Sequence, residues 1–429
     1  MASNLSPDQE FLSRIVQQPF LQQEDSLQQL RKKAQENFLQ LQFPSKKDED
    51  WQFIDLADLK KYQYEIAQPF QVKAQDITSF YLEESNSSRL VCFNGVYQPY
   101  LSSNPIAGVY VGNLSGLTPN KKEKLIDYVN QGQAKPDYFT ALNYSGLSDL
   151  AIVWVEPDVE VKNPVQLFFL TSPNSSPNLV QPHILIVVEK NSKLQLLESY
   201  HCLDQDKDNI YWTNSVSQIF LAENSGLEHT RLQDESLSSF STAKTSVFQK
   251  RNSQYKILEI NLGAQLSRHD LHVTQLGEMT QTSLIGLVQA RGEQTIDIHT
   301  KVDLNYPNGI VEQLQKCILS DRSNVVFNGK IIVPQAAQMT NANQLNRNLL
   351  LSSGAKVNSK PELQITADNV KCSHGATVSQ LEEDEVFYLR SRGLTLSHCK
   401  HLLVEAFAAE IINQISLSSL KQKLFALIQ

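Results

Sequence analysis

Residues 360–393 read KPELQITADNVKCSHGATVSQLEEDEVFYLRSRG. The first half predicts a strand that runs through Cys372 and His374. Because strand side chains alternate between the two faces of a sheet, these two residues point the same way. A thiol and an imidazole on one face can together bind one soft or borderline metal ion. Two ligands do not complete a metal site. The simpler interpretation is that Cys372 is a packed cysteine and His374 an ordinary histidine with no metal role.

The second half of this stretch predicts the start of a C-terminal helical region. Ser379 and Glu382 have the spacing of a capping box, and Gly393 is placed to end the helix as its C′ residue. Two more helices are expected, over residues 397–415 and 417–428. The first has an apolar residue at every fourth position: Cys399, Leu403, Phe407, Ile411 and Ile415.

Upstream, from about residue 140, the helix pattern nearly vanishes for over two hundred residues. Short apolar segments follow one another, separated by Asn, Ser, Asp and Gly, which predicts many short strands. A double sandwich, a barrel and a β-solenoid all remain open at this point. Glycine is scarce, at 16 of 429 residues, so we expect asparagine to supply the left-handed corners.

The N-terminal part is predicted to be more helical. Residues 7–42 have helical periodicity with a break at Pro19. Residues 119–130 are predicted to form a short helix. Residues 89–101 predict a hairpin that turns at Asn94–Gly95, and Trp51 is interpreted as a packing residue. We therefore predict three regions: an N-terminal helical region (1–87), a β-rich core (88–378) and a C-terminal helical module (379–429).

Composition excludes several classes of protein. A net charge of −8 and a pI near 5.7 argue against nucleic acid or an anionic membrane surface as partners. The five cysteines are scattered and form no CxxC, which argues against a disulfide framework, a zinc ribbon or a ferredoxin-type cluster. No secretory signal or spanning apolar run is present. A cytoplasmic location follows as the expectation, with the plastid stroma as an alternative for a processed form.

Catalytic motifs are also missing. The chain has no GxxxxGK[ST], no GxSxG and no HExxH, and the acidic residues 382–385 complement a helix N-terminus. His398 and His401 are expected in solvent and Cys399 in packing. Asp297 and His299 share a strand face and are expected to form a structural pair. We predict a non-catalytic chain.

Three segments resemble a known family. Residues 371–380 (KCSHGATVSQ), 386–393 (VFYLRSRG) and 333–360 (VPQAAQMTNANQLNRNLLLSSGAKVNSK) are similar to SufD, in the SufB/SufD family of iron–sulfur cluster assembly proteins. SufB proteins usually carry Glu-His-Glu-Ala where this chain has Cys372–Gly375. Acids common in the family before this motif are replaced here by Gln364 and Asn369.

The resemblance implies a right-handed parallel β-helix, with main coils from about residue 135, flanked by N-terminal and C-terminal helices. It further implies a scaffold subunit of the SufBCD complex that pairs with a SufB-like subunit and docks a SufC-like ABC-type ATPase through residues 394–429. For the isolated chain, the resemblance implies that a homodimer can form. The candidate docking residues are Phe387, Tyr388, Arg390, Leu403, Phe407 and Ile411.

The same resemblance places His374 at the interface with the SufB-like subunit, as a candidate for cluster assembly with Cys372 beside it. No tightly bound cofactor is expected, only a transient iron–sulfur cluster shared with the partner. Two other functions stay open: a mononuclear metal-binding β-helix protein that uses Cys372 and His374, and a β-helix enzyme that acts on polysaccharide.

Overall fold

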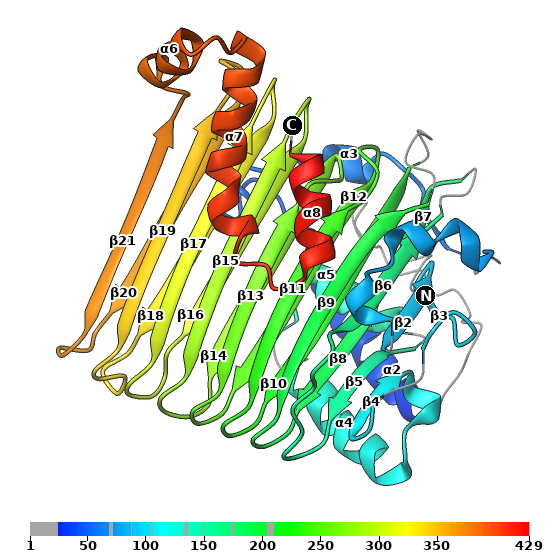
Figure 1. Ribbon diagram of the computed structural model, residues 1–429. Coiled ribbons are helices and arrows are strands. Elements are labelled where there is room, and N and C mark those ends of the chain that lie inside the picture. The colour runs from blue at the N-terminus through cyan, green and yellow to red at the C-terminus, as the bar shows by residue number, and fades with distance from the viewer. Residues whose placement is uncertain are drawn as a thin grey trace.

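A computed structural model describes residues 25–428, apart from 68–71, 87, 104–105, 133–135, 148, 173–175 and 204–209. The chain winds into a parallel β-solenoid of about seven turns, in which each turn contributes one strand to each of two facing sheets (Figure 1). Neighbouring turns pair in parallel register, for example Asn214 with Thr242 and Thr242 with Arg268. The predicted parallel β-helix is confirmed, and the sandwich and barrel alternatives are excluded by this alternation.

The strands and helices have the following bounds. The first sheet holds β4 (Val109–Gly112), β5 (Ala151–Val155), β8 (His183–Val188), β10 (Tyr211–Leu221), β12 (Phe240–Gln249), β14 (Leu266–Gln275), β16 (Thr295–Asp303), β18 (Asn324–Val333) and β20 (Lys356–Ile365), with β1 (Glu65–Ile66) and β7 (Asn178–Val180) beside it. The second sheet holds β2 (Arg89–Phe93), β3 (Val96–Tyr97), β6 (Val165–Thr171), β9 (Lys193–Cys202), β11 (Gly226–Asp234), β13 (Gln254–Asn261), β15 (Gln281–Ala290), β17 (Ile310–Leu319), β19 (Asn341–Leu350) and β21 (Lys371–Ser379). The helices are α2 (Asp25–Gln40), α3 (Ala57–Lys60), α4 (Pro119–Gly132), α5 (Tyr138–Ser145), α6 (Glu383–Ser391), α7 (Leu396–Ile412) and α8 (Ser418–Leu427), with short 3-10 turns η1 (Glu49–Trp51), η2 (Ala74–Asp76), η3 (Thr78–Phe80), η4 (Glu83–Ser85) and η5 (Leu114–Gly116).

Several local predictions can be compared with these bounds. The hairpin turn at Asn94–Gly95 is confirmed, with φ values of 44° and 80°. The capping box is wrong: Ser379 still belongs to β21, and Glu382 precedes α6 without a side-chain cap. Gly393 does end α6 in a left-handed conformation, at φ 89°. The predicted helix at 7–42 contains α2, and Pro19 lies outside the described residues.

Helix α5 was not predicted. Every residue from Tyr138 to Ser145 is buried, so the segment has no polar face from which a helical period could be recognised. Its N-cap is Asp137, whose carboxylate accepts a hydrogen bond from the Thr140 backbone at 2.8 Å. The helix packs on β10 and on α2, and so closes the N-terminal region over the first sheet.

The N-terminal region is fastened to the first sheet by Arg268. Its guanidinium lies 3.7 Å from the centre of the Trp51 ring and donates to the backbone carbonyl of Asp50 at 2.6 Å. The same group pairs with Asp297 at 2.6 Å and Asp270 at 3.1 Å. The packing interpretation of Trp51 is confirmed. The expected pairing of Asp297 with His299 is also observed, at 3.0 Å.

The lumen of the solenoid contains a buried network of charged residues between two apolar zones. Glu198 lies 3.3 Å from His229 and 3.6 Å from Arg231, and Arg231 lies 3.3 Å from Glu259. Burial by itself raises the pKa of Glu198, but the hydrogen bond and charge of His229 and the charge of Arg231 lower it to about 2. Glu259 is likewise lowered to about 2, because His269 at 2.8 Å and Arg231 outweigh its burial.

One corner of the solenoid is a ladder of asparagines, as expected from the composition. Asn191, Asn224 and Asn252 have φ values of 59°, 57° and 56°, and each side-chain amide donates to the residue one turn earlier at 2.7–2.9 Å. Asparagine tolerates this left-handed conformation better than other non-glycine residues. The next residue at this corner is Met279, at φ 62° and with 43% of its surface exposed. Methionine neither tolerates the left-handed conformation as asparagine does nor carries an amide that could continue the ladder.

We expect Met279→Asn to raise the free energy of unfolding by about 1 kcal/mol, because it relieves left-handed strain and extends the amide ladder from Asn252. Urea unfolding followed by circular dichroism measures the change. The converse variant Asn224→Met serves as the control and should lose a similar amount. An unchanged or lower midpoint for Met279→Asn would contradict this account of the corner.

Candidate interaction site at the end of the solenoid

The last turn of the solenoid is open. Strands β20 and β21 pair with β18 and β19 on one side only, and no strand among the described residues pairs with their other edges. Every residue of β21 is exposed or half-buried, whereas Ala342, Gln344, Asn346 and Asn348 of β19 are buried. A free strand edge presents unpaired backbone N–H and C=O groups, which is the usual template for adding another strand.

Cys372 and His374 lie on the lumen side of this open turn. Their partners in register are Ala342 and Gln344, both buried in the lumen, so the two residues stack over the core and share one face. Cys372 is half-buried and packs against the apolar lumen residues that include Ala342, and burial raises the pKa of its thiol. His374 is exposed. No group of three or more His, Cys, Asp or Glu in the described part of the chain is arranged to hold a metal ion.

Below His374 the lumen is lined with amide groups. Gln344 Nε2 donates to Gln313 Oε1 at 2.8 Å, and Gln313 in turn donates to Thr300 Oγ1 at 2.8 Å. A Cβ on Gly329 would lie 2.1 Å from Gln344 Nε2, so the absence of a side chain there makes room for this amide. Gln344 and Gly329 were not found by sequence reasoning, because their proximity depends on how the two sheets face each other.

Helices α7 and α8 cover the outer face of the second sheet (Figure 1). On α7, Val404, Ala408 and Ile412 are buried against it. The ammonium of Lys316, on β17, donates to the Phe407 carbonyl at 2.8 Å and lies 4.4 Å from the Phe407 ring centre. The same ammonium pairs with Glu410. These contacts hold α7 firmly on the solenoid.

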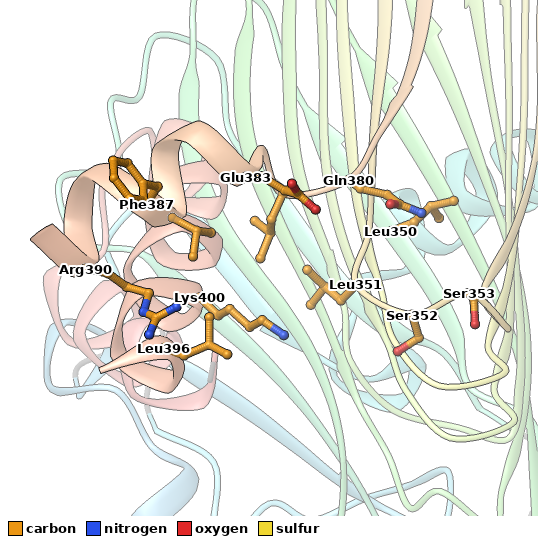
Figure 2. Close-up of a pocket in the computed structure, with 12 residues that line it drawn as sticks. Leu350, Leu351, Ser352, Ser353, Gln380, Glu383, Phe387, Arg390, Leu396 and Lys400 are labelled. Atoms are coloured by element: carbon orange, nitrogen blue, oxygen red, sulfur yellow. The ribbon is translucent and has the colours of Figure 1, made fainter. Parts of the chain in front are cut away.

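Helix α6, by contrast, stands beyond the end of β21 and buries none of its residues (Figure 1). Phe387 and Tyr388 are 74% and 57% exposed, which is unusual for large aromatic side chains. Between α6, α7 and the loop after β19 lies a cavity of about 560 Å³. In Figure 2, Arg390 and Lys400 project into it from the helices, while Leu351 and Ser352 line the solenoid side.

The structure thus separates the six predicted docking residues into two groups. Phe387, Tyr388 and Arg390 lie exposed on α6. On α7, Leu403 and Phe407 are half-buried, and Ile411 is fully buried against the second sheet. Ile411 is therefore a packing residue in this conformation and offers no surface to another protein.

Comparisons with known proteins cover nearly the whole chain. The family described as SUF system FeS cluster assembly, SufBD core domain, matches residues 168–407, and the SufBD protein N-terminal region matches 15–167. An iron–sulfur cluster assembly SufBD family protein of Synechocystis is 46% identical, over 90% of this chain and 86% of its own length. The chloroplastic protein ABCI7 of Arabidopsis thaliana is 35% identical, over 90% and 82%. The iron–sulfur cluster assembly protein SufD of Escherichia coli is 28% identical, over 91% and 90%.

In the described part of the chain, no helix combines the length and the apolar character that a membrane span requires.

Proposed function

The chain belongs to the SufBD family of SUF iron–sulfur cluster assembly proteins, and on that premise we propose that it is a non-catalytic scaffold subunit of the assembly complex. The open turn at β20 and β21 carries the proposal. It leaves two strand edges unpaired and leaves His374 exposed on the lumen side. A SufB-like subunit with the same fold can continue both sheets by adding its own terminal strands to these edges. The isolated chain would pair with a second copy through the same surface.

The iron–sulfur cluster is cargo in this scheme, assembled at the seam between the two subunits. His374 would face the seam and lend its imidazole, and ligands from the partner would complete the set. Cys372 is the weaker candidate, because a thiol must ionise to bind iron and burial raises its pKa. The alternative of a mononuclear metal protein lacks a third ligand among the described residues. The three relatives described above are named for iron–sulfur cluster assembly or as a chloroplastic protein, which gives no support to the alternative of a polysaccharide-acting enzyme.

The ABC-type ATPase would dock on α6 and the neighbouring cavity. The two exposed aromatic rings would supply the apolar anchors, and Arg390 with Lys400 would supply positive charge for an acidic residue of the partner. Leu403 and Phe407 border this region, whereas Ile411 is excluded by its burial. A cytoplasmic location is proposed, or a stromal one if the chain is a plastid form like the Arabidopsis relative.

His374→Ala tests the proposed role in cluster assembly. The chain is co-expressed with its SufB-like and SufC-like partners, and the purified complex is reconstituted with iron and sulfide. We expect the complex to form normally and the yield of cluster, read from visible absorption, to fall by about tenfold or more, since one ligand of a shared set is lost.

His398→Ala removes an exposed histidine from α7 and is the matched control, with no expected effect. If His374→Ala assembles cluster as well as the unaltered chain, the assignment of His374 fails. If the subunits do not co-purify at all, the pairing scheme itself fails, so the two parts of the proposal are tested separately.

A further inference from the structure

A second cavity, of about 330 Å³, lies between α8, the outer face of the second sheet and residues 79–82. Its apolar wall includes the side chains of Leu82, Leu197, Leu232, Leu420 and Leu424. These residues come from three segments far apart in the chain, so the cavity exists only where the N-terminal region, the solenoid and the C-terminal helix meet. Small-molecule sites are typically of this kind: concave, largely apolar, and located between structural units.

His201 contributes a buried polar group to this apolar wall. Its side chain is 8% exposed, and its ring lies 5.0 Å from that of Phe80 and 5.6 Å from that of Phe168. Nδ1 is 3.5 Å from Asp234 Oδ2, which is too far for a normal hydrogen bond, and it makes no hydrogen bond among the described residues. A buried ring nitrogen without a hydrogen bond is destabilising, and it points to a polar group that is present when the cavity is filled.

Lys423 supplies a positive charge at the mouth of the same cavity. Its ammonium donates to the backbone carbonyls of Ser79 at 2.7 Å and Tyr81 at 3.4 Å. Among the described residues the only carboxylate that acts on it is Glu84, which does not form an ion pair with it. Partial burial lowers the pKa of Lys423, and the negative charge of Glu84 offsets only part of that effect. An anion at the mouth would supply the direct ion pair that Glu84, at longer range, does not form with Lys423.

We propose that this cavity binds a free, medium-chain carboxylate, with its hydrocarbon chain against the leucines and its head group beside Lys423. The site is distinct from the open turn and from α6, and it adds a small-ligand activity to the proposed scaffold role. Each methylene buried in the cavity should improve the affinity about fourfold until the cavity is full. His201 and Asp234, on the wall, favour a ligand that also carries a hydroxyl group along its chain.

Calorimetric titration of the full chain with octanoate, octanol and octylammonium tests this inference, because the three probes share one hydrocarbon chain and differ in the head group. We expect saturable binding of octanoate, weaker binding of octanol and none of octylammonium. Lys423→Met should weaken octanoate binding by about tenfold or more and leave octanol unchanged. Lys421→Met, also on α8 but outside the cavity wall, is the matched control and should bind octanoate normally.

Ala426→Phe places a ring into the cavity from an exposed position on α8, so the fold should survive while octanoate and octanol both lose affinity. An unchanged circular dichroism spectrum verifies the folding of each variant. The proposal is overturned if the unaltered chain shows no saturable octanoate binding, if Lys423→Met binds octanoate unchanged, or if octylammonium binds as tightly as octanoate.

Discussion

Replacing Phe387 and Tyr388 together by serine is expected to weaken the binding of the proposed ATPase partner by about 100-fold or more, so that the ATPase no longer co-purifies with the tagged chain. The two rings are 74% and 57% exposed on a helix that buries none of its own residues. Large exposed aromatic side chains mark protein interaction surfaces and add little to the stability of the free chain. The free variant should therefore unfold at the same urea concentration as the unaltered chain.

A matched control is available on other parts of the surface. Phe53 and Tyr100 are also a phenylalanine and a tyrosine with exposed rings, at 44% and 61%, and they lie before α3 and after β3, respectively. Their double replacement by serine removes the same chemistry and should leave ATPase retention intact. Affinity is measured by surface plasmon resonance with the purified ATPase. If the α6 variant retains the ATPase as well as this control does, α6 is not the docking site.

The second large effect is expected inside the solenoid, from Arg231→Met. Arg231 is 1% exposed and lies between Glu198 and Glu259, which both have a pKa lowered to about 2. Methionine matches the volume of the arginine but removes the charge and leaves two buried carboxylates underneutralised. Breaking a buried ion pair in this way costs about 3–5 kcal/mol. Urea unfolding at pH 7 measures the loss.

The pH dependence of this loss identifies its cause. A carboxyl group whose pKa is lower in the folded state stabilises the fold above its unfolded pKa, about 4.3, and loses that effect as the pH falls toward 2. Acid therefore neutralises the carboxylates in both proteins, and the difference between Arg231→Met and the unaltered chain should shrink below about pH 4.3. A difference that is the same at pH 7 and pH 3.5 would indicate lost packing instead.

Arg251→Met is the control for an ion pair in solvent. Arg251 and Glu278 lie 3.0 Å apart, but their side chains are 57% and 41% exposed. An exposed pair of this kind contributes about 0–1 kcal/mol, because water screens both charges. Equal losses for Arg231→Met and Arg251→Met would show that burial of the lumen network does not matter to stability.

The sequence alone was sufficient for features that depend on neighbouring residues. The alternation that places Cys372 and His374 on one face is a property of any strand, and asparagine at the corners follows from its tolerance of left-handed backbone. The turn at Asn94–Gly95 and the stop at Gly393 rest on the same kind of local preference. The β-helix itself was identified through the resemblance of residues 333–393 to the family, because periodicity left three β architectures open.

Tertiary structure decided which faces are buried and which residues meet. Glu198, Arg231 and Glu259 lie on successive strands of the second sheet and come together only through the stacking of turns, which brings residues about one turn apart in sequence into register. The strand pattern could not tell the lumen face from the outer face, since both carry apolar and polar residues. Phe387 and Ile411 are both large apolar residues of the C-terminal helices, yet one is 74% exposed and the other fully buried. The difference arises because α7 packs on the second sheet, whereas α6 extends past its last strand, contacts α7 and buries none of its residues.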